Sequence, residues 1–161
     1  MPTRTIQKPQ NRDFIRVGRS RIEGKGVFAK RKIPKGTRII EYAGMRISRE
    51  KLFVELTDGV ATPVYIFGLN ETTVIDAQRE GNDARFINHS CEPNCEAYLF
   101  DNKVYIYAMR DMIRGEELSF DYKLTSAFGG MQPKKFKDAY ICKCGSANCR
   151  GTMLAKRRRR T

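Results

Sequence analysis

Residues 85–94 read Arg-Phe-Ile-Asn-His-Ser-Cys-Glu-Pro-Asn, and they hold the single histidine of the chain together with two asparagines and a cysteine. Residues 115–122 follow as Gly-Glu-Glu-Leu-Ser-Phe-Asp-Tyr, and a cysteine cluster then occurs at Cys142, Cys144 and Cys149. A lone histidine is more often a core residue than a functional one. The ordered set of three motifs is therefore more informative than His89 alone.

In this order the motifs resemble the signature of SET-domain protein-lysine methyltransferases that carry a zinc-binding post-SET tail. The resemblance extends over about residues 15–154 and is closest in wording to the trithorax-type branch, which methylates lysine 4 of histone H3. The cysteine-rich pre-SET region of another branch has no counterpart before residue 85. A compact chain of this kind also fits a microbial enzyme that acts on its own DNA-packing proteins or on host chromatin.

Short runs of β-branched and aromatic residues, separated by Gly, Asn, Asp or Pro, predict a mainly β protein with few short helices. The runs cover residues 14–17, 37–42, 64–69, 73–75, 104–109 and 118–120. Residues 100–103 predict a hairpin turn, and residues 49–56 predict a helix with Ser48 as its N-cap and with Leu52 and Leu56 on one face. The resemblance implies a SET domain (β-clip) of short curved sheets, with the Asn88 and Tyr122 segments packed in a knot-like crossing.

A length of 161 residues suits one domain. We expect a basic N-terminal extension over 1–13, a SET domain over 14–125, a linker over 126–141, a post-SET zinc segment over 142–154 and a basic tail over 155–161. No apolar run approaches the roughly 20 residues of a membrane span, and the first residues lack a secretory signal. We therefore expect no membrane partner and an intracellular protein, at chromatin in a nucleus or in the cytoplasm and nucleoid of a microbe.

The net charge of +13 is distributed unevenly along the chain. Residues 1–40 carry 12 Lys and Arg against 2 Asp and Glu, residues 150–161 carry 6 against none, and residues 41–149 carry 13 against 16. Basic segments at both ends of the chain and a slightly acidic middle suit a protein that receives a basic segment, such as a histone tail. Such a protein can also contact nucleic acid through its basic termini. The alternative interpretation is that these charges only keep the surface soluble.

Residues 24–29 read Gly-Lys-Gly-Val-Phe-Ala and satisfy the Gly-x-Gly-x-x-Ala form of a dinucleotide-binding fingerprint. That fingerprint needs a following helix, whose N-terminus holds a pyrophosphate. Residues 30–36 contain Pro34 and Gly36 and cannot form such a helix. The sequence therefore argues against a dinucleotide site. Two interpretations of residues 24–29 remain: an ordinary turn between strands, or a loop whose glycines let the backbone approach another ligand.

The resemblance implies that S-adenosylmethionine is the methyl donor and that one set of residues holds it. That set is Gly24, Lys25, Gly26, Tyr65, Arg85, Asn88, His89 and Leu154. Tyr65 is equally well explained as an aromatic residue of a strand. Phe136, Tyr140 and Met153 are alternatives to Leu154 at the adenine.

The resemblance also implies the catalytic residues Tyr122, Tyr42 and Phe120. A fixed phenol such as Tyr122 can orient a methyl group and stabilise a polarised transition state without removing a proton. Aromatic walls that include Tyr42 suit a lysine, because its stem is apolar while its head is charged. The resemblance implies that Phe120 occupies a position where a tyrosine hydroxyl would hold a water near the amine and crowd out further methyl groups. Phenylalanine lacks that hydroxyl, so we expect the product to reach the di- or trimethyl state.

The three clustered cysteines follow the pattern Cys-x-Cys-x4-Cys, which is too tight for several disulfides and indicates a metal in a reducing compartment. Structural zinc takes four ligands. Cys91, Cys95 and His89 are the candidates for the fourth ligand, and the resemblance selects Cys91. The site is then one zinc ion held by Cys91, Cys142, Cys144 and Cys149; free thiols without a metal are the alternative. The alternative function is a non-catalytic, basic, zinc-containing module of the same fold that binds chromatin or DNA.

Overall fold

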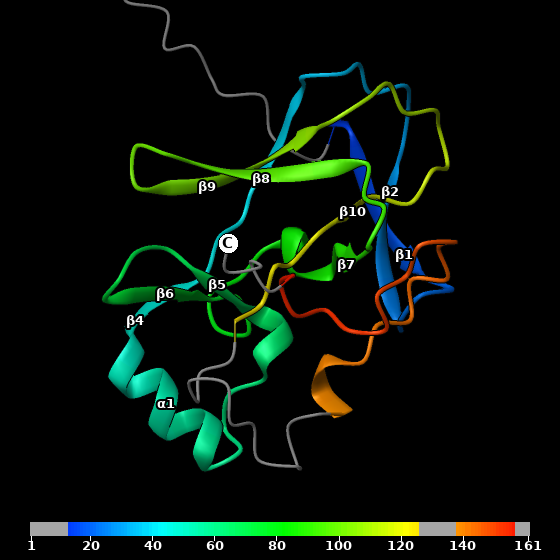
Figure 1. Cartoon of the computed structure of the whole chain (residues 1–161). Helices are drawn as coiled ribbons and strands as arrows, with labels where there is room; N and C mark the ends of the chain where they lie inside the picture. The colour runs from blue at the N-terminus through cyan, green and yellow to red at the C-terminus, as the bar shows by residue number, and fades with distance from the viewer. Residues whose placement is uncertain (1–12, 126–137, 157–161) are drawn as a thin grey trace, which may run out of the picture.

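The computed structural model describes residues 13–125 and 138–156. The basic N-terminal extension, most of the expected linker and the end of the basic tail (residues 1–12, 126–137 and 157–161) lie outside the described residues. In the described part, three sheets and one α-helix form a mainly β fold, which confirms the predicted class (Figure 1). No helix within those residues is both long and apolar enough to cross a membrane.

The sheets have two, five and three strands. The first is the hairpin of β1 (Ile15–Arg19) and β2 (Lys25–Ala29). The second has the order β3 (Arg38–Glu41), β9 (Lys103–Ala108), β8 (Cys95–Phe100), β10 (Ser119–Phe120) and β7 (Asn88–His89). The third has the order β4 (Met45–Ser48), β6 (Thr73–Asp76) and β5 (Ile66–Gly68). The helical segments are α1 (Arg49–Thr57) and the 3-10 turns η2 (Pro63–Tyr65), η3 (Asp83–Phe86) and η4 (Asp138–Tyr140).

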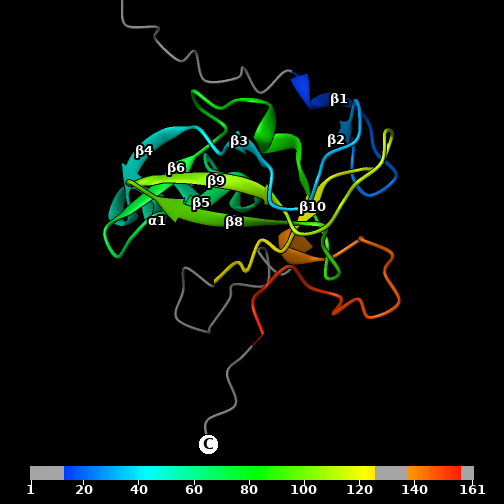
Figure 2. The ribbon, with the colours of Figure 1, turned by 90° about the horizontal axis from the view of Figure 1, so that it is seen from above.

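Both views place the β1–β2 hairpin at one end of the molecule and α1 with β4 at the other (Figures 1 and 2). The five-stranded sheet lies between these ends. Its inner strands supply much of the main core, in which Val104, Ile106 and Leu118 are fully buried. The fold therefore has two peripheral sheets around one central sheet.

The predicted helix and hairpin turn are both confirmed. The hydroxyl of Ser48 accepts a hydrogen bond from the amide of Lys51 at 3.1 Å, and Leu52 and Leu56 are buried against the three-stranded sheet. Asp101 and Asn102 join β8 to β9 with φ angles of 50° and 58°. Asn and Asp adopt this left-handed region more readily than most residues, which explains why a two-residue turn forms here.

Other element boundaries differ from the expectation. The strand expected over residues 64–69 begins only at Ile66, because Pro63 fixes its own φ and opens a 3-10 turn that ends at Tyr65. Gly26 lies inside β2 and not in a loop. The two-residue strand β7 was not expected at all, since two residues show no periodicity.

The centre of the fold is a parallel contact between two very short strands. Asn88 and His89 of β7 pair with Ser119 and Phe120 of β10, and Phe120 also pairs with Cys95 of β8. These are the two segments that the resemblance predicts to pack together. Two residues give few ladder hydrogen bonds, so the pairing needs support from elsewhere.

Asn94 gives that support. Its side chain is buried; its amide nitrogen donates to the carbonyl of Glu117 at 2.8 Å, and its amide oxygen accepts from the backbone N–H of Ser119 at 2.9 Å. The side chain of Asn94 thus bonds the backbone of the residues before and after Leu118, as a neighbouring strand would. The segment that enters β10 is held in register by this amide.

We predict that Asn94→Ala lowers the free energy of unfolding by about 2–4 kcal/mol, because a buried N–H and a buried C=O each lose their partner. Denaturant titration measures the change. Gln78→Ala removes an exposed amide and should change the free energy by less than about 0.5 kcal/mol. Equal effects of the two substitutions would show that Asn94 does not hold β10.

Candidate active site and metal centre

A cavity of about 500 Å³ lies beside β7. Six of the residues assigned to the methyl donor line it, namely Gly24, Lys25, Tyr65, Arg85, Asn88 and His89. Tyr122 lines it too, together with residues that the sequence did not indicate, among them Ile22, Glu23 and Phe86. Gly26 and Leu154 do not line it, whereas Met153, one of the alternatives to Leu154, does. Segments far apart in sequence therefore meet at one hollow.

Asn88 holds the loop that forms one wall of this cavity. Its amide nitrogen lies 3.0 Å from the carbonyl of Lys25, 3.3 Å from the carbonyl of Glu23 and 3.0 Å from a carboxylate oxygen of Glu117. Gly26 is explained by the same packing, because a Cβ at this position would overlap with the Glu117 carboxylate. The glycine makes room for Glu117, whereas Gly24, with a φ of +33°, faces open space.

Arg85 holds an unused donor beside the cavity. Its guanidinium stacks on the ring of Phe86 at 4.7 Å. Its Nε is buried and, among the described residues, has no hydrogen-bond partner. A buried donor without an acceptor costs roughly 1–3 kcal/mol. The Nε is closed off from the cavity, but Arg85 is one of the lining residues and leaves a cationic side chain on its wall.

His89 connects the cavity to the second motif and to the cysteines. Its Nδ1 accepts a hydrogen bond from the backbone N–H of Tyr122 at 3.1 Å, and the two rings lie 5.3 Å apart, edge to face. Burial lowers the pKa of His89 below its ordinary value, although Asp121 opposes the shift. The neutral ring therefore carries its proton on Nε2, which lies 3.5 Å from Sγ of Cys91.

Four aromatic side chains line up behind His89. The ring of Tyr122 lies 4.9 Å from that of Phe120, and Phe120 lies 6.3 Å from Tyr42 and 6.4 Å from Phe67. Phe67 was not recognised from the sequence, where it is one more aromatic residue in a predicted strand. Together the four rings form a wall that suits an apolar stem and a cationic head.

Both phenols in this wall stay neutral. Burial is the main cause that raises the pKa of Tyr122 and of Tyr42 well above the ordinary value of about 10. The hydroxyl of Tyr122 donates a 2.6 Å hydrogen bond to the carbonyl of Ile87, which fixes its direction. Tyr122 can therefore orient and polarise a neighbouring group, but it is a poor proton acceptor.

A second cavity, of about 850 Å³, lies between α1, β5, the start of β8 and residues 121–125. Phe67 and Glu96 are among its lining residues. Tyr122 lines this cavity as well as the smaller one. One phenol thus stands at the junction of two hollows, and two molecules that enter from different sides could meet beside it.

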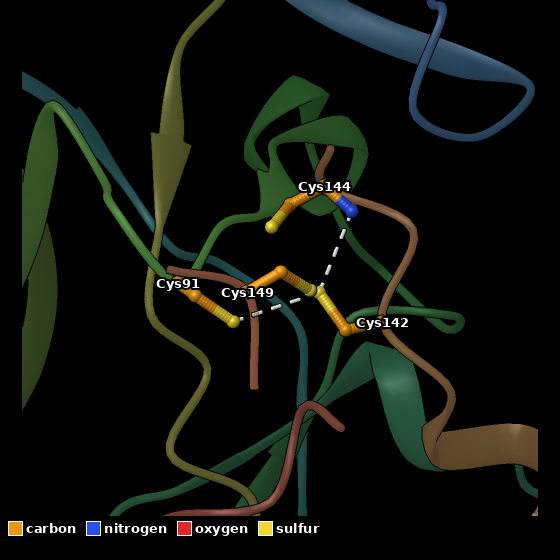
Figure 3. Close-up of side chains that lie close together, drawn as sticks. All are labelled: Cys91, Cys142, Cys144 and Cys149. Atoms are coloured by element: carbon orange, nitrogen blue, oxygen red, sulfur yellow. Dashed lines mark hydrogen bonds between the residues drawn. The ribbon is translucent and has the colours of Figure 1, made fainter. Parts of the chain in front are cut away.

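The four cysteines expected to hold zinc converge on one point (Figure 3). Their Sγ atoms all lie within 4.8 Å of one another, and those of Cys91 and Cys142 are 3.7 Å apart. A zinc ion with four thiolates at about 2.3 Å places the sulfurs roughly 3.8 Å apart, so the set fits this metal. Cys95 is fully buried in β8 and is not part of the group.

Arg150 ties the cysteine segment to the Tyr122 motif. Its guanidinium forms two hydrogen bonds with the carboxylate of Asp121, at 2.9 and 3.0 Å, and its backbone N–H donates to Sγ of Cys91 at 3.3 Å. Burial is the largest single influence on Asp121 and would raise its pKa, but the hydrogen bonds from Arg150 and from the backbone of Lys123, together with the charge of Arg150, lower that pKa. No pattern in the sequence indicated this pair, because Arg150 is one cation among many.

A family model described as the SET domain matches residues 24–123. Histone-lysine N-methyltransferase trithorax of Drosophila virilis is 38% identical over 93% of this chain and 4% of its own length. Histone-lysine N-methyltransferase 2B of Homo sapiens is 37% identical over 89% of this chain and 5% of its own length. The H3 lysine-4 specific enzyme of Schizosaccharomyces pombe is 40% identical over 85% of this chain and 15% of its own length. The chain thus spans a small part of these relatives.

We predict that the purified protein carries one zinc ion per chain, and that Cys142→Ser loses it, since three thiolates leave the tetrahedron open. Elemental analysis after dialysis measures the metal content. Cys95→Ser is the matched control, because Cys95 lies outside the cluster, and it should keep the metal. A full zinc content in Cys142→Ser would remove Cys142 from the ligand set.

Proposed function

Because this chain belongs to the SET-domain family, we propose that it transfers a methyl group from S-adenosylmethionine to the side-chain nitrogen of a protein lysine. The observation that carries the proposal is the place of Tyr122, whose ring borders both cavities. The names of the relatives favour a histone as the substrate. The proposed substrate is a lysine in a histone tail or a similarly basic segment.

The smaller cavity is the proposed site of the methyl donor. Asn88 fixes the Gly24 loop, the guanidinium of Arg85 is proposed to meet an acidic end of the donor, and His89 closes the floor beside Tyr122. Gly26 supports this site only through its packing on Glu117. The bound donor supplies an electrophilic methyl group on a sulfonium.

The larger cavity is the proposed entrance for the substrate. Phe67 lines this cavity, whereas Tyr42 and Phe120 are buried and line neither cavity. The lysine stem would pass Phe67 on an apolar path that the other two rings support from behind. The Tyr122 hydroxyl, directed by the carbonyl of Ile87, positions the nitrogen and the methyl group. Since neither phenol accepts a proton readily, the lysine arrives neutral or loses its proton to water before the transfer.

The cysteine cluster has a structural role in this proposal. Cys91 follows His89 by two residues, so a zinc ion bound to Cys91 and to the C-terminal cysteines fixes the floor of the donor site. Residues 138–153 then close one side of the cavity. The proposed place of action is chromatin, and the basic termini, which lie mostly outside the described residues, are proposed to add contacts to nucleic acid.

We predict that Tyr122→Phe lowers methyl transfer by roughly 10²–10³-fold, the usual effect of removing one positioned electrostatic group. Transfer of labelled methyl groups to core histones measures the rate. Tyr107→Phe is the control, since Tyr107 borders neither of the two cavities, and it should keep the activity. A wild-type protein that retains DNA but transfers no methyl group would favour the non-catalytic binding module.

We predict that the wild type forms di- or trimethyllysine and that Phe120→Tyr shifts the product to monomethyllysine. Phe120 is buried beside Tyr122 and Tyr42, so an added hydroxyl occupies the space that further methyl groups need. Mass spectrometry of a methylated peptide at long reaction times reads the state. Phe100→Tyr, at an exposed position, should leave the product unchanged. Monomethyl product alone from the wild type contradicts the prediction.

A further inference from the structure

We propose that the outer surface of the β1–β2 hairpin binds the phosphate backbone of double-stranded nucleic acid. The surface consists of Arg16, Arg31 and Arg114, and we call it the basic face. All three side chains are exposed. This inference concerns the folded domain and not residues 1–13 or 155–161, and it does not depend on methyl transfer.

The three arginines belong to segments around residues 28–31, at the open end of the hairpin, where Ile15 pairs with Ala29. Arg16 pairs with Phe28 across the hairpin, and its guanidinium lies 4.8 Å above the Phe28 ring. The guanidinium of Arg31 lies 4.4 Å above the ring of Phe14. The backbone N–H of Gly115 donates to the carbonyl of Ala29 at 2.8 Å, which places Arg114 beside the same segment.

The aromatic contacts give the guanidinium groups of Arg16 and Arg31 a fixed direction. Phe14 packs against the main core, so the stacked guanidinium of Arg31 is held at the surface by a rigid support. A guanidinium on an aromatic face keeps its donors free at its edge. Less side-chain entropy is then lost when a phosphate binds, because the side chains are ordered beforehand.

The positive charge of the basic face is not neutralised within the described part of the chain. There, none of its three arginines forms an ion pair, while Glu23, Asp111 and Glu116 already have cationic partners. Glu23 pairs with Lys143 at 2.9 Å, and Asp111 pairs with Lys32 at 4.0 Å. Over residues 13–38, nine Lys and Arg stand against two Asp and Glu. An external polyanion would supply the missing counter-charge.

The spacing of phosphates suits this group of arginines. The phosphates of each DNA strand follow one another at about 3.4 Å along the helix axis. The face can therefore meet several phosphates at once. It is also a poor membrane surface, because Ile113 is the one large, exposed apolar residue in its segments, within the described residues.

The basic face leaves the proposed active site open. Arg16, Arg31 and Arg114 line none of the three described cavities. The hairpin loop of residues 22–25 does line the donor cavity, but it lies at the other end of the strands. A duplex on the open end of the hairpin could be held while a protein segment occupies the larger cavity.

The test compares full-length variants that remove three positive charges from opposite ends of the molecule. The first carries R16Q, R31Q and R114Q, and the control carries R46Q, K51Q and K103Q, on β4, α1 and β9 at the far end (Figures 1 and 2). Fluorescence anisotropy with a labelled 20-base-pair duplex measures the affinity over a range of salt. We expect the first variant to bind at least tenfold more weakly, with a salt slope smaller by about 2–3, and the control to bind within about twofold of wild type.

A third variant with R16K, R31K and R114K keeps the charge and should bind within about threefold of wild type, which separates lost charge from lost folding. Equal weakening in the first variant and the control would overturn the proposal, since only net charge would then matter. Unchanged binding in the first variant would also overturn it. So would a wild type that binds vesicles of anionic phospholipid but no duplex.

Discussion

The parallel contact between β7 and β10 is the constraint on which the site depends. It is only two residues long on each side, yet it brings the imidazole of His89 to the backbone N–H of Tyr122 at 3.1 Å. Asn94 secures one side of this contact with a buried amide. If β10 slipped by one residue, the side chains of Phe120 and Tyr122 would exchange faces with their neighbours, and the aromatic wall would be lost.

A second set of contacts joins this centre to the C-terminal segment. Cys91 meets Nε2 of His89 on one side and the cysteine cluster on the other, while Arg150 reaches back to Asp121. The four cysteines, the imidazole and the phenol are therefore parts of one connected unit. These contacts link the stability of the cysteine segment to the shape of the cavity of about 500 Å³, because residues 138–153 form one wall of that cavity.

Local signals in the sequence predicted local structure well. Ser48 with Leu52 and Leu56 defined α1, and Asp101-Asn102 defined a turn. The convergence of distant motifs came from the resemblance, because no local pattern indicates a pairing of two-residue strands. Phe67, Asn94 and Arg150 were missed for a related reason: each acquires its role from partners 23 or more residues away, and each is ordinary in its own segment. Why position 26 must be a glycine could not be predicted from the sequence either, because a Cβ there would overlap with Glu117, which is remote in sequence.

The most direct test of the account is a crystal structure of the full chain with S-adenosylhomocysteine bound. We predict that this molecule fills the cavity of about 500 Å³ lined by Arg85, Asn88 and His89. Its sulfur should be directed at the ring of Tyr122. Binding in the larger cavity, or on a surface away from Tyr122, would contradict the central claim that one phenol stands between donor and lysine.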